Sequence, residues 1–355
     1  MRVATIPVRR LYQQKLLGPK CKTPEAAVEW LGAVQSQDYP AAKWALGLRV
    51  KNATDALVET AFNEGRFLRT HVMRPTWHFI MPENVTWMQE VTSSRVRAIL
   101  ASYDRKLEIT PELRKKTNKI LEEVLSGKNY KTRTELADEF EKHKIMARGQ
   151  RLGHLMAHPE LDALICSGPR RGKQFTYALV AERAPKQKRF SRDEGLATLA
   201  TWYIRSHGPA QVKDLAWWAG LTIKDAAYAV DNIKATLHSE VIEDRTYWFV
   251  PGAPIETLTK PAAFLLSIFD EFTIAYKDRQ DIGDERIAEK LLSMGNALTA
   301  VVVLNGRIVG TWKRSIRKKD VDVKLTLHSS QNREEKHAID EAIHAYNAFL
   351  DLDSV

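Results

Sequence analysis

The chain has 355 residues, of which 44% are hydrophobic and 28% are charged, so it is long enough for two or three globular domains with separate cores. Its formal net charge is +10. A basic balance favours a polyanionic partner such as a nucleic acid, although a basic enzyme of another kind fits the charge equally well.

Cysteine usage and the chain's apolar runs narrow the class of protein further. Cys21 and Cys166 are the only cysteines and form no Cys-x-x-Cys pair, so neither a zinc ribbon nor a disulfide framework is indicated. Residues 1–18 lack the apolar core of a signal peptide, and runs such as 298–304 are too short to cross a bilayer. We therefore expect a cytoplasmic protein that does not associate with a membrane.

The first 130 residues mix helical and strand signals. Thr23-Pro24-Glu25 predicts the start of a helix, with Thr23 as the N-cap. The apolar residues that follow keep helical spacing to about Gln35, and Pro40 is expected to mark a break after this helix. The stretch 70–80 is rich in β-branched and aromatic residues and predicts a strand, while 111–125 predicts another helix.

Residues 131–185 have the pattern of a complete small module. A capping box from Thr132 to Glu135 opens a helix, and a second helix covers 150–157. A basic turn at 170–173 then leads into a strand over 174–180. Helices followed by a basic hairpin are typical of a winged helix, although a generic helical domain with one hairpin has the same pattern.

The same order of elements recurs after a polar linker at 184–189. Helices are predicted over 193–206, 211–219 and 222–237, and a strand pair over 241–250 with its turn at 243–245. The two modules have no sequence identity that would mark them as internal repeats.

The last part of the chain, residues 256–355, is β-rich. Strands are predicted at 298–304 and 307–312, joined by Asn305-Gly306, and at 321–327, before a closing helix over 338–350. A densely basic segment, Lys313 to Lys319, lies between two of these strands. It is equally consistent with a solvated turn and with a hairpin tip that enters a DNA groove.

Several familiar chemistries are absent from the sequence. There is no glycine-rich nucleotide loop, no nucleophile elbow and no HExxH motif. His154 and His158 are four residues apart in helical sequence, but no third ligand is suggested by spacing, so we predict no metal site and no cofactor. The pair Trp217-Trp218 has the chemistry to stack on bases, although aromatic residues inside a helical module usually belong to the core.

The most distinctive polar residues are Gln35 and Gln37, at the end of the first predicted helix. If helical geometry ends there, residues two apart point the same way and the two amides project together, although a polar helix terminus also explains them. A second set of polar side chains alternates with apolar ones along the strand predicted over 70–80 and shares one face, namely Thr70, Arg74, Thr76 and His78.

With these segments in view, the sequence resembles the AlkZ-like, YcaQ-related winged-helix DNA glycosylases. The matching segments follow the family's order along nearly the whole chain, at 34–38, 69–78, 208–221, 269–279 and 306–314. The resemblance implies an α+β fold in which three tandem winged-helix modules form a C-shaped, basic DNA channel, followed by a β-rich region with a DNA-probing hairpin. We accordingly expect modules at 1–130, 131–185 and 190–255, and the β-rich region at 256–355.

The resemblance also implies roles for single residues. Family members carry Gln-x-Gln or Gln-x-Asp as a catalytic signature, which corresponds here to Gln35 and Gln37 with Ser36 at the usually apolar middle position. Asp38 lies one place beyond the aspartate of the second form and does not inherit its role. DNA contacts are expected from the 69–78 stretch, where a fold-internal network fits Arg74, Thr76 and His78 equally well, and from the basic hairpin. The expected contact residues are Arg69, His71, Arg74, Thr76, His78, Trp312, Lys313, Arg314, Arg317, Lys318 and Lys319.

The implied activity is that of a monofunctional DNA glycosylase on cationic N7- or N3-alkylated purines of double-stranded DNA, with bulky adducts and interstrand crosslinks as a hypothesis. A glutamine carbonyl can orient the attacking water but cannot take up its proton near neutral pH, so the base must already be activated for departure. We expect a monomer that acts on nucleoid DNA in base excision repair. The alternative is a non-catalytic winged-helix transcription regulator, which usually dimerises on a palindromic operator.

Overall fold

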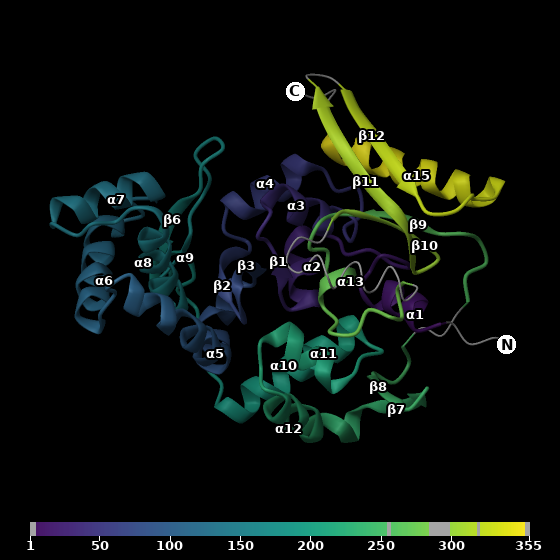
Figure 1. Ribbon diagram of the computed structural model, residues 1–355, viewed down its shortest axis with the longest axis horizontal. Coiled ribbons are helices and arrows are strands. Elements are labelled where there is room, and N and C mark those ends of the chain that lie inside the picture. Colours follow the sequence, from purple (N-terminus) through teal and green to yellow (C-terminus); the bar gives the residue numbers. More distant parts are fainter. Residues whose placement is uncertain (1–4, 254–256, 284–298, 318–319, 352–355) are drawn as a thin grey trace.

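The structure is a computed structural model (Figure 1) that describes residues 5–253, 257–283, 299–317 and 320–351. Over these residues it combines helices with four small antiparallel sheets. In Figure 1 the helices of residues 111–161 (α6–α8) lie on one side of residues 24–80, which carry α2 to β3. The long hairpin formed by β11 (Arg307–Arg317) and β12 (Asp320–Leu327) lies on the other side.

The first group of elements carries the Gln-x-Gln segment. After α1 (Ile6–Gln13) come α2 (Pro24–Leu31), β1 (Val34–Gln35), α3 (Tyr39–Gly47), α4 (Asp55–Asn63), β2 (Leu68–Val72) and β3 (Arg74–Ile80). The strands form a sheet of order β1-β3-β2, in which His78 pairs with Gln35 on one side and with Thr70 on the other. Because cross-strand partners share a face, these three side chains form one row across the sheet.

Local expectations for this region need correction at three points. The helix expected to reach Gln35 ends at Leu31, because Gly32 follows with a positive φ of 80°, and residues 34–35 form a strand instead. Pro40 starts a helix rather than marking a break, since it lies in the first turn of α3. The single strand expected over 70–80 is a hairpin that turns at Met73, whose φ is 64°.

The second group follows a 3-10 turn (Pro82–Asn84) and the long helix α5 (Val85–Lys106). It contains α6 (Pro111–Leu125), β4 (Lys131–Thr132), α7 (Arg133–Lys142), α8 (Gly149–Leu161), β5 (Ile165–Ser167), β6 (Thr176–Leu179) and α9 (Val180–Arg183). The capping box predicted at Thr132 and Glu135 is present at the start of α7. Helix α6 packs with α7, α8 and β6 around one apolar core, although we expected it in the first module. We therefore propose to place the boundary near residue 109 instead of 130.

The third group repeats the order of the other two. It consists of α10 (Arg192–His207), α11 (Val212–Ala219), α12 (Ile223–Ile233), β7 (His238–Ile242) and β8 (Arg245–Phe249). The helix predicted over 222–237 is shorter, since a 3-10 turn (Lys234–Thr236) follows α12. Each group runs helix, short strand, two helices and hairpin, and in the third group a single bridge between Ala210 and Trp248 takes the place of the short strand.

The C-terminal region is a four-stranded sheet of order β12-β11-β10-β9 with a covering helix. Its elements are β9 (Ala263–Leu266), α13 (Glu271–Ile274), β10 (Val301–Leu304), β11 (Arg307–Arg317), β12 (Asp320–Leu327) and α15 (Arg333–Leu350). The turn predicted at Asn305-Gly306 joins β10 to β11, and both residues have positive φ. The sheet shares a core with the first group, where Trp44 and Trp312 pack edge-on against Tyr346.

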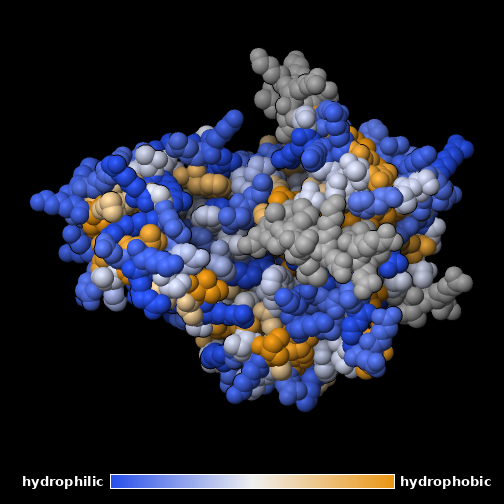
Figure 2. Space-filling model, in the orientation of Figure 1, coloured by the Kyte–Doolittle hydropathy of each residue, from blue (hydrophilic) through white to orange (hydrophobic). Residues whose placement is uncertain are grey.

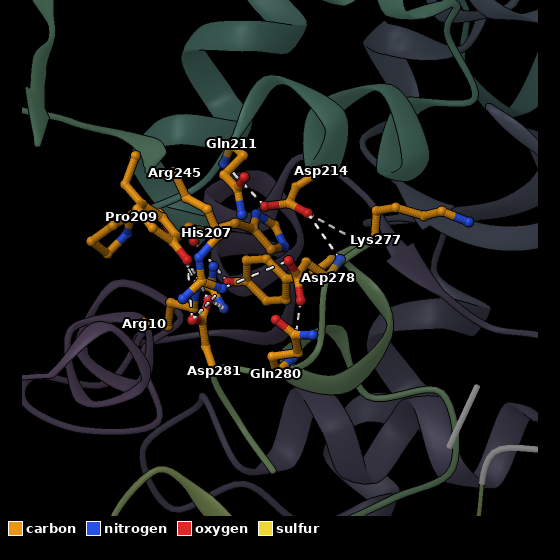
Figure 3. A network of polar contacts seen from close by, with 12 residues as sticks. Arg10, His207, Pro209, Gln211, Asp214, Arg245, Lys277, Asp278, Gln280 and Asp281 are labelled. Atoms are coloured by element: carbon orange, nitrogen blue, oxygen red, sulfur yellow. Dashed lines mark hydrogen bonds and ion pairs between the residues drawn. The ribbon is translucent and has the colours of Figure 1, made fainter. Parts of the chain in front are cut away.

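A buried polar network joins α1 to the third group and to the segment after α13 (Figure 3). The Arg10 Nε donates to the Pro209 carbonyl at 2.9 Å, and its Nη1 lies 3.1 Å from Asp281. Asp214, on α11, accepts a hydrogen bond of 2.9 Å from the Lys277 backbone N–H. These contacts hold α1, α11 and residues 277–281 together.

The tip of the β2–β3 hairpin lies against the turn between α11 and α12. Gly220 has a φ of +67°, and a β-carbon at this position would lie 1.9 Å from the Met73 carbonyl oxygen. Only glycine permits so close an approach of two backbones. Since Arg74 follows directly after Met73, this contact also sets the start of β3.

Replacing Gly220 with alanine should force these two backbones apart. We expect the free energy of unfolding to fall by at least about 1–3 kcal/mol, the cost of one strained backbone position, with the steric clash in addition. Chemical denaturation measures the change. Gly127→Ala is the matched control, because Gly127 also has a positive φ of 75° but would meet nothing within 4 Å. Equal losses in the two variants would mean that the Met73 contact contributes nothing.

Candidate active site

A cavity of about 620 Å³ opens where the first group, α5, α11 and the segment 269–279 meet. Its size and its position between groups are typical of small-molecule sites. Figure 2 shows a mainly hydrophilic face in which hydrophobic side chains form only small patches. The cavity is lined by Gln35, Gln37, Met73, Arg74, Pro75, Thr76, Arg95, Val96, Ile99, Ala216, Trp217, Gly220, Phe269, Ile274, Lys277 and Arg279.

The two glutamines predicted to be catalytic both line this cavity. Gln35 ends β1 and is 8% exposed, and Gln37 is exposed in the turn before α3. Strand β1 and the turn that follows it, rather than the end of a helix, bring them to the same cavity. On the same wall, the buried hydroxyl of Thr76 has no hydrogen-bond partner within the described part of the chain. An unsatisfied buried hydroxyl beside two amides points to a polar ligand or water.

Arg74 orients the Gln35 side chain. Its Nη2 donates to Gln35 Oε1 at 2.9 Å and lies 3.3 Å from His78 Nε2. His78 Nδ1 donates to the Thr76 carbonyl at 3.0 Å, which leaves Nε2 as the acceptor for Arg74. Burial, together with the Arg74 charge, lowers the pKa of His78 well below its usual range, so the imidazole is neutral at pH 7.

A buried carboxylate lies behind the glutamines. Glu271, at the start of α13, is 0% exposed. Its Oε1 accepts a hydrogen bond of 2.8 Å from the Gln35 backbone N–H, and its Oε2 accepts one of 3.2 Å from the Trp218 indole N–H. Burial by itself raises the pKa of Glu271. The His207 imidazole at 3.6 Å, the Arg74 charge and the Gln35 N–H outweigh burial and lower the pKa overall. The Glu271 side chain is therefore an anion at neutral pH.

The charged groups that reach the cavity itself are cations. Arg74, Arg95, Lys277 and Arg279 line it, and none of the described lining residues is acidic or a histidine. Arg95 donates to the Leu221 carbonyl at 2.7 Å, which holds its side chain in place. A cationic lining suits a ligand that carries phosphates, and it offers no strong general base.

The polar residues predicted at the DNA from the 69–78 stretch divide between two faces of the β2–β3 hairpin. Arg74 and Thr76 line the cavity, but Arg69 lies over the ring of Phe175, between β5 and β6, and His71 contacts α8. His71 Nδ1 lies 2.6 Å from Glu160 on α8, and Arg69 is 5% exposed. The structure thus assigns Arg69 and His71 to a contact between groups, because successive side chains of a strand point to opposite faces. His78, predicted on the cavity face, is 0% exposed and therefore supports Arg74 rather than touching DNA.

Known proteins resemble this chain in sequence pattern and in fold. A sequence model of the AlkZ-like DNA glycosylases matches residues 28–349. The chain belongs to the AlkZ-like DNA glycosylase family. The solved structure of the DNA glycosylase AlkZ from Streptomyces sahachiroi shares this fold, with a TM-score of 0.80. The match covers 98% of this chain and 97% of that chain, and the two sequences are 19% identical. No curated protein matches the chain.

The basic hairpin of this AlkZ-like protein has an apolar and a polar face. Trp312, predicted at the DNA, is 4% exposed; its indole N–H donates to the Leu266 carbonyl at 2.8 Å, so it is a core residue. Arg314 lies on the same face and donates to the Tyr346 hydroxyl. Lys318, Lys319 and the side chain of Arg317 lie outside the part of the chain that the structure describes.

On the polar face of the hairpin, Lys313 pairs directly with Lys324 of β12, and both are exposed. Like charges directly opposite each other on neighbouring strands are destabilising. The pair therefore favours a polyanion on this face, and Lys324 is a candidate contact outside the basic segment 313–319.

The histidines at positions 154 and 158 share one partner. His154 Nδ1 lies 3.0 Å and His158 Nε2 lies 2.9 Å from the Asp104 carboxylate on α5. They fasten α8 to α5, and no group of metal-ligating residues occurs among the residues that the structure describes. Over the same residues, no helix has the length and apolar character needed to cross a membrane.

Sequence reasoning missed several residues of the cavity and its surroundings. Glu271, Lys277 and Arg279 lie in the segment 269–279, which carried the family resemblance without an assigned role, and Arg95 lies on α5. The available signal for Glu271 was its residue type, because two acidic residues, Asp270 and Glu271, between Phe269 and Phe272 are unusual unless they have buried partners.

Glu271→Gln should keep the shape of this side chain but remove its charge and one acceptor. Either the Gln35 N–H or the Trp218 N–H then loses its partner. We expect the free energy of unfolding to fall by about 1.5–3 kcal/mol, typical of a hydrogen bond to a charged group. Chemical denaturation checks this, with Glu243→Gln as the control because that side chain is 79% exposed. A Glu271 variant as stable as the control would contradict the assigned contacts.

Proposed function

We propose that this protein is a monofunctional DNA glycosylase that hydrolyses the N-glycosidic bond of cationic N7- or N3-alkylated purines in double-stranded DNA. One observation carries the proposal. In a chain of the AlkZ-like family, Gln35 and Gln37 line a cavity whose other polar groups are cations and a hydroxyl. The cations suit DNA phosphates, and the two amides suit a water molecule.

The reaction needs water held against C1′ of the sugar while oxocarbenium-like charge develops there. Gln37 is exposed to the cavity, and its carbonyl can accept a hydrogen bond from this water. Gln35 Oε1 accepts from Arg74 with one lone pair and keeps the second for the same water. The Glu271 carboxylate, bonded to the Gln35 backbone, adds a negative potential behind the developing cation.

The leaving base must supply the activation that the protein lacks. An amide takes up no proton near neutral pH, and the absence of a general base forfeits about 10²–10⁴-fold in rate. A purine alkylated at N7 or N3 is cationic and departs as a neutral molecule without an acid. We propose that such adducts are excised while uracil is not. Since the cavity measures about 620 Å³, the proposal extends to bulky adducts and interstrand crosslinks.

We further propose that each of the three groups is a winged-helix module and that the groups form a basic channel for DNA. Their common order of helices and hairpin supports this, as does the exposed pair Lys313 and Lys324, which we assign to phosphate contacts on the β11–β12 hairpin. Three modules in one chain can surround a duplex without a partner subunit. The protein would thus act as a monomer on nucleoid DNA in the cytoplasm.

Replacing both Gln35 and Gln37 with alanine should abolish base release while leaving DNA binding intact. We expect the single-turnover rate on an N7-methylguanine duplex to fall at least about 10²-fold, as when a preorganised transition-state contact is removed, with Kd for the duplex within twofold. HPLC detection of the free base measures the rate.

Gln150→Ala, which removes an exposed glutamine on α8, is the control for this experiment. Undiminished release by the double variant would refute the assigned mechanism. Efficient uracil release by the unaltered protein would refute the substrate class. A footprint on one undamaged sequence with no base release would instead indicate a transcription regulator.

The rate of base release should stay nearly constant from pH 7 down to about pH 5.5, because no group assigned to the mechanism titrates there. The pKa of His78 is lowered well below 6.5, so it stays neutral, and the pKa of Glu271 is lowered from 4.5, so it stays ionised. A carboxylate with a lowered pKa loses its contribution only as pH falls through that lowered value. Single-turnover rates across this range test the expectation. A decline with a midpoint near pH 6 would reveal a general base.

A further inference from the structure

Two aromatic side chains, Trp217 and Phe269, line the cavity without a part in the mechanism above. Trp217, on α11, is 38% exposed, whereas the adjacent Trp218 is fully buried. Core packing therefore explains Trp218 but leaves the exposed surface of Trp217 unexplained. The Trp217 indole N–H donates to the Ile274 carbonyl at 2.8 Å, which fixes the orientation of the ring.

Among the apolar residues that line the cavity, two have unfavourable backbone conformations. Met73 has a φ of 64° and Phe269 a φ of 63°, and both line the cavity. A left-handed φ is rare for bulky side chains, persists only where the surroundings impose it, and is concentrated at ligand sites. Ile99 and Ile274 are two further apolar residues that line the same cavity as the indole.

A fixed, exposed indole in an apolar wall binds planar aromatic molecules by stacking. The purine is the planar group that the proposed reaction sets free in this cavity. The Lys277 ammonium lies over one face of the Trp217 ring, 4.8 Å from its centre, which leaves the other face for stacking. From there it repels a cationic purine on the indole but not a neutral one. An interaction that is stronger after the purine has lost its charge assists bond cleavage.

We propose that Trp217, with the apolar wall formed by Met73, Phe269, Ile99 and Ile274, is the binding subsite for the leaving purine, which stacks on the indole as its positive charge passes to the sugar. This inference rests on the proposed glycosylase activity and adds a defined place for the base. The ligand class is a neutral purine, and its alkylated cation binds more weakly.

Two small molecules test the subsite directly. 7-Methyladenine is the neutral product of excision, and 7,9-dimethyladeninium has the same ring with the charge of the intact lesion. Isothermal titration calorimetry with the full chain should give at least about tenfold tighter binding of 7-methyladenine than of the cation. Failure of 7-methyladenine to bind, or equal binding of the two molecules, would overturn the proposal.

Substitutions separate stacking from a structural role of the tryptophan. Trp217→Leu should weaken 7-methyladenine binding at least about tenfold, as expected for the loss of one stacking platform. Trp217→Phe keeps an aromatic face but loses the bond to Ile274, and should bind within about threefold of the unaltered protein. Tyr228→Leu, which removes a 45% exposed aromatic residue on α12 outside the cavity lining, should change nothing. Unaltered binding by Trp217→Leu, or equal loss in the Leu and Phe variants, would contradict stacking.

Base release by the same variants distinguishes this inference from the glycosylase proposal. Trp217→Leu should slow single-turnover release from an N7-methylated duplex about tenfold, with the Kd for the duplex within twofold. Normal release by this variant would refute the subsite while leaving the activity intact. Conversely, Trp217-dependent purine binding by a protein that releases no base would refute the activity and leave a purine site.

Discussion

The hydrogen bond between the Gln35 backbone and the Glu271 carboxylate joins residues that are 236 positions apart in the chain. Strand β1 has only two residues, so its pairing with β3 gives little support on its own. One oxygen of Glu271 holds this strand and the other holds Trp218 on α11, so the glutamines, the third group and the C-terminal region meet at one buried charge. An isolated buried charge is too costly to keep, and loss of one partner therefore weakens the arrangement of all three.

The arrangement of charge around the cavity follows from this constraint. Cations line the cavity, where they can neutralise phosphates, while the carboxylate is withdrawn behind the backbone of Gln35. Arg74 connects the two regions, because it lines the cavity, donates to the Gln35 amide and contributes to the lowered pKa of Glu271. In the proposed mechanism, water is therefore oriented next to a negative potential, although no carboxylate among the described residues reaches the cavity to take its proton. Such a site favours substrates whose leaving group is already charged.

Features with a local physical signal could be predicted from the sequence, and features that depend on distant partners could not. The capping box at Thr132 and the turn at Asn305-Gly306 were identified because their residue types act within a few positions. The end of α2 depended on the conformation of Gly32, which periodicity does not reveal. Helix α6 packs with α7 and α8 rather than with the elements before it, which the sequence does not reveal, since an amphipathic pattern shows that a face is buried but not against what.

Dependence on distant partners also explains why the sequence did not show which residue of the Trp217-Trp218 pair is exposed. Adjacent residues of a helix point about 100° apart, so one of them can enter the core while the other faces away. Which of the two reaches a cavity was decided by the segment 269–279, which packs against α11 from elsewhere in the chain. That segment supplies the Ile274 carbonyl and the Lys277 ammonium that hold the exposed ring, and also the Glu271 carboxylate that holds the glutamine strand. The positions proposed for the water and for the base are thus both set by one short stretch of chain, whose physical role becomes visible only when its partners are in place.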